Sequence, residues 1–284
     1  MSMKTIRPDN HLNHFFFLML ALALMSGACN KHESTPPENN ARTSSVDTQR
    51  EGEQIAERYR AIDNSEQSVS KTKAVVKNGD GTVQEVAMTI SRKRAADGRR
   101  LMLVEFTSPD QERDRNALVI INPKGDIEAT RYIQSNDSFA SANSAVSEDS
   151  LFGMTMQELA DGQTEKYNFR LVGEEEFEGK PVYRLEGKLK DGMESKFPRI
   201  VLLISKENSA ALVAEFYDNQ NQVIRRATID KMAQSNGHWT RMHWVVDNQA
   251  RQKKIEFETV KTDYDSPLSD SIFTRDHLKK ITSR

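Results

Sequence analysis

The sequence contains a single cysteine, Cys29, in 284 residues, which excludes an intramolecular disulfide and any zinc site built from several thiolates. The fold must therefore be held by the burial of apolar side chains rather than by cross-links. The chain also has no large excess of charge of one sign, because it contains 40 Lys and Arg and 42 Asp and Glu. No basic stripe dominates the chain, so nucleic acid is not an expected partner.

The common catalytic and cofactor motifs are absent as well. The chain has no Gly-x-Ser-x-Gly, His-Glu-x-x-His, P-loop or Gly-x-Gly-x-x-Gly pattern. His238 and His243 are five residues apart in a predicted strand, so their side chains should point to opposite faces and not share a metal. We therefore predict a protein that is not an enzyme and that has no metal site and no cofactor.

The chain has one long apolar run, and it lies near the N-terminus. Phe15 to Met25 follows a basic start and precedes the small residues Ser26-Gly27-Ala28, the pattern of a signal peptide. As a helix this run rises only about 16 Å, too short for a hydrocarbon core of about 30 Å. We expect residues 1–28 to be a signal peptide that directs export.

Cys29 directly follows this leader and admits three interpretations. The arrangement resembles the lipobox of bacterial lipoproteins, in which the cysteine becomes the acylated first residue, although Ser26 stands where an aliphatic residue is usual. Cleavage after Ala28 would instead expose a free N-terminal thiol, and the third interpretation is an incidental cysteine in the leader. We favour lipidation of Cys29, because a lone thiol in an exported protein otherwise needs a reason. Asn30 is compatible with a periplasm-facing outer-membrane lipoprotein.

Composition divides the remainder into a tether and one domain. Residues 29–47 are polar, contain Pro36 and Pro37, and bury too little apolar surface to offset chain entropy, so we expect a disordered tether. Residues 48–284 then form one domain, a normal size for a barrel-like fold.

The domain changes its hydrophobic period after its first segment. Ile55, Tyr59 and Ile62 share one face of a helix predicted over 48–62. From Ser68 onward short alternating segments follow one another with turns such as Asn78-Gly79-Asp80-Gly81, which indicates hairpins. We predict an α+β fold with about eleven antiparallel strands, a loop with short helices over 134–163, and a final helix over 273–281.

Several segments in this order resemble the family of LolA-like, outer-membrane lipoprotein-sorting proteins, over about residues 86–278. The telling segments are Phe106-Thr107-Ser108-Pro109 before Ala117-Leu118-Val119-Ile120, Leu151-Phe152-Gly153-Met154, Glu178-Gly179-Lys180-Pro181 before Tyr183-Arg184-Leu185-Glu186, Ala214-Glu215-Phe216-Tyr217-Asp218, and Ser269-Asp270-Ser271-Ile272-Phe273-Thr274. The resemblance implies an incomplete, half-open antiparallel barrel capped by short helices around an apolar cavity for acyl chains. One departure, Arg113-Asp114-Arg115-Asn116 in place of the usual glycine, puts the shape of that loop in doubt.

From this resemblance we expect an envelope lipoprotein that binds lipid or the acyl chains of a lipoprotein, in lipoprotein sorting or lipid transfer and without catalysis. Its membrane contact would be the lipidated Cys29. The alternative is a non-catalytic accessory or interaction module of an inner-membrane transporter or efflux system. One face of the alternating strands supplies the candidate cavity lining: Val86, Met88, Ile90, Met102, Val104, Phe106, Leu212, Phe216 and Trp244.

Overall fold

The computed structural model describes residues 45–62, 65–141 and 163–284. The chain divides into two compact units, Met1–Arg42 and Thr43–Arg284, and all described residues belong to the second. This unit contains an antiparallel sheet of thirteen strands with helices packed against it. No helix in the described part of the chain is both long and apolar enough to cross a bilayer.

In the part of the chain that the structure describes, two α-helices flank the strands, and short 3-10 helices join some of these strands. The α-helices are α1 (Ser45–Arg60) and α3 (Arg275–Thr282). The strands are β1 (Gln67–Asn78), β2 (Val83–Arg94), β3 (Arg100–Ser108), β4 (Ala117–Ile121), β5 (Ile127–Ile133), β6 (Ser138–Ser141), β7 (Tyr167–Phe177), β8 (Lys180–Leu189), β9 (Arg199–Ser205), β10 (Ala211–Tyr217), β11 (Val223–Ser235), β12 (His238–Asn248) and β13 (Lys253–Asp263). The 3-10 helices are η1 (Asp110–Arg115), η2 (Gln134–Asn136), η3 (Thr164–Lys166), η4 (Gln249–Arg251) and η5 (Asp270–Phe273).

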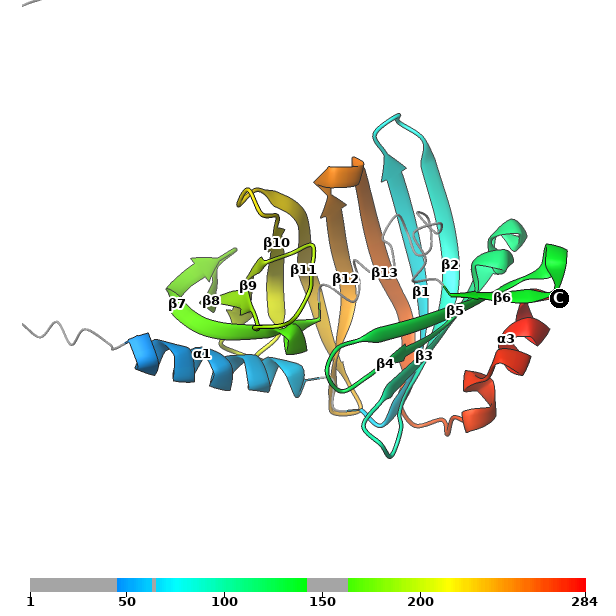
Figure 1. The fold of residues 1–284 in the computed structure, drawn as a ribbon, viewed down its shortest axis with the longest axis horizontal. Coiled ribbons are helices and arrows are strands. Elements are labelled where there is room, and N and C mark those ends of the chain that lie inside the picture. The colour runs from blue at the N-terminus through cyan, green and yellow to red at the C-terminus, as the bar shows by residue number, and fades with distance from the viewer. Residues whose placement is uncertain (1–44, 63–64, 142–162) are drawn as a thin grey trace, which may run out of the picture. The chain divides into compact units, whose positions relative to one another are not determined.

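The sheet is a meander whose first and last strands also pair with each other. Its order is β6-β5-β4-β3-β2-β1-β13-β12-β11-β10-β9-β8-β7, with β6 and β7 at its two ends and not hydrogen-bonded to one another (Figure 1). The predicted α+β, half-open antiparallel barrel with an N-terminal helix is therefore confirmed. The expected count of about eleven strands was low. The additional β6 lies in the stretch that we predicted as loop, because four residues are too few to display a period.

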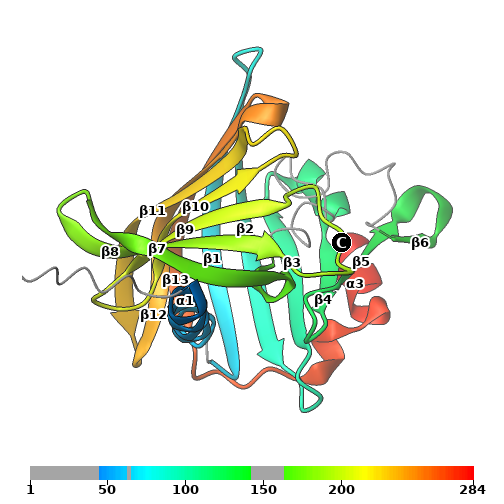
Figure 2. The ribbon, with the colours of Figure 1, turned by 60° about the vertical axis from the view of Figure 1, so that its left-hand side comes forward.

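Bulges bend the long strands and let the sheet curl. The register shifts between Lys71 and Thr72 in β1 and between Ala87 and Met88 in β2, and shifts also occur in β7, β10 and β11. A bulge adds an unpaired residue on one strand and increases its local twist. The sheet consequently curves, and α1 lies against the face inside that curve (Figure 2). We refer to the face that α1 covers as the inner face.

Two groups of buried side chains occupy the inner face. The first cluster comes from β1–β5, β12 and β13: Ala74, Val76, Val86, Met88, Val104, Phe106, Ala117, Val119, Ile127, Ala129, Val246, Ile255 and Phe257. The second cluster joins α1 to β7–β10: Ile55, Ala56, Tyr167, Phe169, Leu185, Phe197, Ile200, Leu202, Ile204, Ala211 and Phe216. The strand pairing shows that both clusters lie on the same face of the sheet. Phe216 of the second cluster is opposite Arg225, and Val246 of the first cluster is opposite Ala227. Arg225 and Ala227 are two residues apart on β11, so their side chains share a face.

Helix α1 packs closely on β7 because one of its residues has no side chain. A Cβ on Gly52 would lie 2.5 Å from the backbone of Arg170, so only glycine permits this approach. Glu53 also accepts a hydrogen bond of 2.6 Å from the backbone N–H of Phe169. The helix thereby covers part of the sheet edge at β7, which would otherwise present unpaired backbone groups.

Helix α3 covers the opposite, outer face over β3–β5. Phe273, Leu278 and Ile281 pack there with Leu103, Leu118 and Tyr132. The loop of uncertain shape forms η1 and is tied to this helix through Asn116, which is fully buried. The Asn116 side-chain oxygen accepts from the Phe106 N–H at 2.7 Å, and its nitrogen is 3.4 Å from the Thr282 hydroxyl. The loop therefore has, in place of the expected glycine, an asparagine whose side chain hydrogen-bonds both to the β3 backbone and to α3.

Candidate functional site

Most of the predicted lining residues meet in the first cluster. Val86, Met88, Val104 and Phe106 are members, and Ile90, Met102 and Trp244 pack against it while partly exposed. The Trp244 ring stacks on Phe257, with centroids 4.8 Å apart. The alternation of β2, β3 and β12 therefore did place these side chains on one face. Whether they contact a ligand remains a prediction.

Leu212 and Phe216 do not join the others. Phe216 belongs to the second cluster, beneath α1. Leu212 packs with Val213 and Leu203 on the other face of the sheet. The cause is a bulge between Ala211 and Val213, which inserts Leu212 as an extra residue and breaks the period of two. Simple alternation over β10 was therefore the wrong basis for grouping Leu212 with Phe216.

The apolar rows of the inner face end in polar residues on one side. The row of β2 reads Ile90, Met88, Val86 and then Gln84, and the pairing places Gln84 opposite Val76 of β1. The row of β13 passes from Phe257 and Ile255 to Lys253, which pairs with Asn78. The row of β5 passes from Ile127 and Ala129 to Arg131. These row ends surround a cavity of about 460 Å³, lined by Val76, Asn78, Gln84, Val86, Gln111, Glu112, Asp114, Arg115, Arg131 and Lys253.

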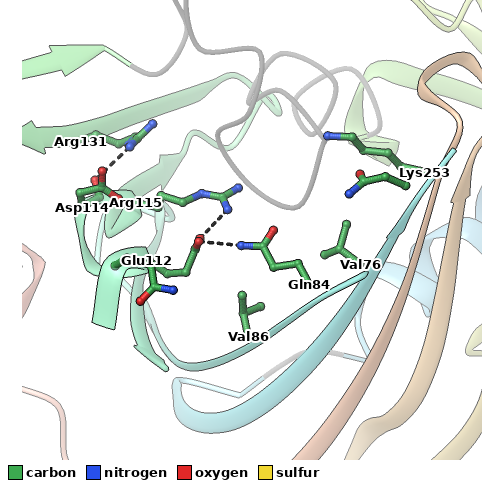
Figure 3. A pocket seen from close by; sticks show the side chains of 10 residues that line it. Val76, Gln84, Val86, Glu112, Asp114, Arg115, Arg131 and Lys253 are labelled. Atoms are coloured by element: carbon green, nitrogen blue, oxygen red, sulfur yellow. Dashed lines mark hydrogen bonds and ion pairs between the residues drawn. The ribbon is translucent and has the colours of Figure 1, made fainter. Parts of the chain in front are cut away.

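A buried carboxylate organises one wall of this cavity. Glu112 of η1 is only 8% exposed and accepts hydrogen bonds of 2.6 Å from Gln84 Nε2 and from Arg115 Nη1 (Figure 3). The Arg115 guanidinium also lies over the Phe106 ring, 5.6 Å from its centroid. The network thus holds Arg115 between the apolar cluster and the cavity. Charge-assisted pairs of this kind are among the stronger hydrogen bonds in proteins.

Arg131 is the least satisfied group of the wall. Its Nη2 donates to the backbone oxygen of Asp114 at 3.0 Å, but its buried Nε has no hydrogen-bond partner. Burial lowers the pKa of Arg131 from its ordinary value, and the neighbouring charge of Asp114 partly opposes this. A buried donor without an acceptor costs about 1–3 kcal/mol. The Arg131 side chain lines the cavity, although its Nε is closed off from solvent.

Arg115 and Lys253 extend into the cavity from opposite sides, with Gln84 between them (Figure 3). Together with Arg131 they make three cationic side chains against the carboxylates of Glu112 and Asp114. We did not single out these cavity residues from the sequence. Gln84, Arg131 and Lys253 each lie two residues beyond an apolar residue of the inner face. This spacing was the one sequence signal that could have placed them on the same face. The contribution of η1 could not be seen, because a 3-10 turn has no period of two.

The two strand histidines have separate neighbours, but an extra residue, Met242, lies between them in β12 and breaks the alternation from which opposite faces were predicted. His238 stacks on Tyr264, with ring centroids 4.6 Å apart. His243 lies between Asp230 and Glu256, which contact its two different ring nitrogens at 2.6 and 3.2 Å. Within residues 45–62, 65–141 and 163–284, no group of three or more His, Cys, Asp and Glu side chains is arranged to hold a metal ion.

Fold and inner face together define an open antiparallel barrel of the LolA-like class. A family model described as that of an uncharacterized protein matches residues 98–280, more than half of the chain, so the chain belongs to that family. This match and the LolA-like solved structures described next together confirm the predicted family. The Leu151–Met154 segment that contributed to the resemblance lies outside the described residues. No curated protein matches the sequence.

Solved structures share the fold at low sequence identity. A DUF1329 family protein from Desulfovibrio piger is 22% identical, with a TM-score of 0.74 over 81% of this chain and 99% of that one. A domain described as that of an outer membrane lipoprotein-sorting protein, from Vibrio parahaemolyticus, is 20% identical, with a TM-score of 0.73 over 81% and 99%. A LolA superfamily protein from Nitrosomonas europaea is 14% identical, with a TM-score of 0.58 over 80% and 98%.

Proposed function

We propose that this protein binds lipid, or the acyl chains of a lipoprotein, on the first cluster of its inner face and acts in lipoprotein sorting or lipid transfer without catalysis. The observation that carries the proposal is a broad apolar face in an unclosed sheet, whose rows end at a polar cavity. The description of the Vibrio relative as a lipoprotein-sorting domain agrees with this role.

The energetics require such a face. Transfer of an acyl chain from lipid into water costs about 0.8 kcal/mol per methylene, so a sixteen-carbon chain faces roughly 10 kcal/mol. A carrier must offset most of this by burying the chain against comparable apolar surface. Met88 and Met102 suit that purpose, because an unbranched thioether adapts to an irregular, flexible ligand.

The two tryptophans allow a direct test of the location. Trp244 packs on the first cluster, whereas Trp239 lies about 16 Å farther along the same strand. In the Trp239→Phe variant, a brominated fatty acid should quench the fluorescence of Trp244 upon binding. The matched Trp244→Phe variant, which retains Trp239, should show little quenching. Absence of saturable quenching in both variants, or equal quenching in both, would contradict the proposed binding face.

We also propose that the protein is exported and anchored in the envelope, facing the periplasm, through an acylated Cys29. The basis is the signal peptide-like leader and the small residues before the cysteine. An anchored protein cannot be a free shuttle, so it would act as a receptor or local acceptor. Metabolic labelling with a palmitate analogue should mark the wild-type protein but not Cys29→Ser. Labelling that persists in Cys29→Ser, or is absent from both, would exclude the anchor.

One observation favours the alternative of an accessory module for an inner-membrane transporter. Members of the first cluster are only 0 to 7% exposed, as in a filled core. A rigid, filled barrel would offer its outer surface to a protein partner instead. Crosslinking in envelope extracts separates the two functions: a stoichiometric transporter adduct, together with no lipid in native mass spectra of the purified protein, would support the module.

A further inference from the structure

We propose that the cavity beside the first cluster binds the phosphate group of an anionic lipid headgroup, with the acyl chains of the same lipid on the apolar rows. This inference rests on the proposed function and adds the class of headgroup to it. It begins from the cavity walls, where apolar and cationic side chains meet within one space of about 460 Å³. Pockets for small ligands are commonly about 300–1,000 Å³, which is sufficient for a headgroup.

The position of the cavity argues for an amphipathic ligand rather than a free ion. Val76 and Val86 belong both to the first cluster and to the cavity wall. A ligand in the cavity therefore contacts the apolar face directly. Gln84, Arg131 and Lys253 end three separate apolar rows at this same place. A molecule whose apolar part follows the rows and whose polar end reaches past them matches this pattern.

The side chains of the cavity argue for an anion. Glu112 pairs with Arg115 and accepts from Gln84, so the Glu112–Arg115 pair carries no net charge. The other charged side chains of the lining are Arg131 and Lys253 against Asp114, which leaves the cavity with a net positive charge. Arg115 and Lys253 extend into the cavity from opposite sides (Figure 3). A phosphate offers several strong acceptor oxygens and can bridge such donors, and arginine binds it in a planar, bidentate manner.

The test compares two lipids with the same acyl chains, one with and one without a phosphate-bearing headgroup, and the free phosphate ion. The mature full chain is titrated with dioctanoylphosphatidylglycerol, with dioctanoylglycerol and with inorganic phosphate, with the fluorescence of Trp244 and calorimetry as readouts. We expect the phosphatidylglycerol to bind roughly tenfold more tightly than the uncharged diacylglycerol, in line with one or two charge-assisted hydrogen bonds. Inorganic phosphate alone should bind much more weakly than the lipid, because it lacks the apolar contacts.

Variants then assign the preference to the cavity. Arg131→Gln and Lys253→Gln should each remove most of the difference between the two lipids by weakening phosphatidylglycerol binding more than diacylglycerol binding. Arg113→Gln is the matched control, because Arg113 lies on η1 but pairs with Asp110 and does not line the cavity. Arg131→Lys should restore part of the preference, since it retains the charge. Lys253→Gln keeps the test valid if Arg131→Gln does not fold.

The outcomes separate this inference from the proposed function. Equal binding of the two lipids by the wild-type protein would overturn the headgroup site and leave acyl-chain binding intact. Binding of neither lipid would overturn the proposed function itself. Binding of inorganic phosphate as tight as that of the phosphatidylglycerol, abolished by Arg131→Gln, would show a free-anion site and overturn the lipid assignment.

Discussion

The two halves of the inner face are built from similar strands but are covered differently. Over β7–β10, helix α1 inserts Ile55 and Ala56 among aromatic side chains and completes a core. Over β1–β5, β12 and β13, the described members of the first cluster all come from strands. The helix contributes two of the eleven buried members of the second cluster and makes this region a stable scaffold. In the described residues, the other region presents strand side chains whose rows end at a polar cavity, which agrees with the proposed binding of lipid there.

The largest expected effect concerns the half covered by the helix. Phe169 is fully buried and receives the guanidinium of Arg60 over its ring at 5.5 Å. Phe169→Ala should lower the free energy of unfolding by about 3–5 kcal/mol, because it leaves a cavity that α1 and β8 cannot close. Urea denaturation of the two proteins measures the difference. A loss below about 1 kcal/mol would mean that α1 is not part of the core.

The contact of α1 with β7 determines whether Gly52→Ala stabilises or destabilises the protein. Alanine is a better helix former than glycine by about 1 kcal/mol, so Gly52→Ala would stabilise an unpacked helix. Because its Cβ would lie 2.5 Å from the Arg170 backbone, we expect destabilisation by about 1–3 kcal/mol instead. Gly173→Ala is the matched control in β7, since a Cβ there meets nothing within 4 Å. Stabilisation by Gly52→Ala, measured by thermal unfolding, would show that the helix stands off the sheet.

A smaller effect should appear in the ligand-binding half. Ile90 packs against the first cluster while partly exposed. Ile90→Asn should weaken binding of dioctanoylglycerol about tenfold, equivalent to the lost contact of roughly two methylenes. Val260→Asn introduces the same side chain at a 53% exposed position on β13 and should leave binding unchanged. Equal effects of the two substitutions in the fluorescence titration would remove the distinction between inner and outer face.

The same two halves show which parts of the fold and of the site could be predicted from the sequence. Alternation in β2 and β3 and the apolar period of the first helix predicted the strands, the helix and four of the thirteen buried members of the first cluster. Alternation failed at Leu212, because a bulge depends on pairing with β9 and leaves no mark in the strand itself. The cavity was missed for a different reason. Its wall brings Glu112, Arg131 and Lys253 together from separate segments, and only the strand register places them side by side.

The smallest expected effect lies on β11–β13, where His243 bridges two neighbouring strands. Hydrogen bonds to Asp230, and secondarily to Glu256, raise the pKa of His243 above its ordinary value despite some desolvation. Since the folded pKa exceeds the unfolded value of about 6.5, the charged ring stabilises the fold most below that pH. This contribution is lost as the pH rises through the folded pKa.

Because the three side chains are partly exposed, the stabilisation from His243 should remain below about 1 kcal/mol. The free energy of unfolding, measured between about pH 5.5 and about pH 8.5, should fall more for the wild-type protein than for His243→Gln. His277→Gln on α3 is the control and should follow the wild-type profile. Identical profiles for wild type and His243→Gln would mean that the bridge adds nothing to this half. The first cluster would then depend on its apolar contacts alone, which would strengthen the contrast with the half that α1 secures.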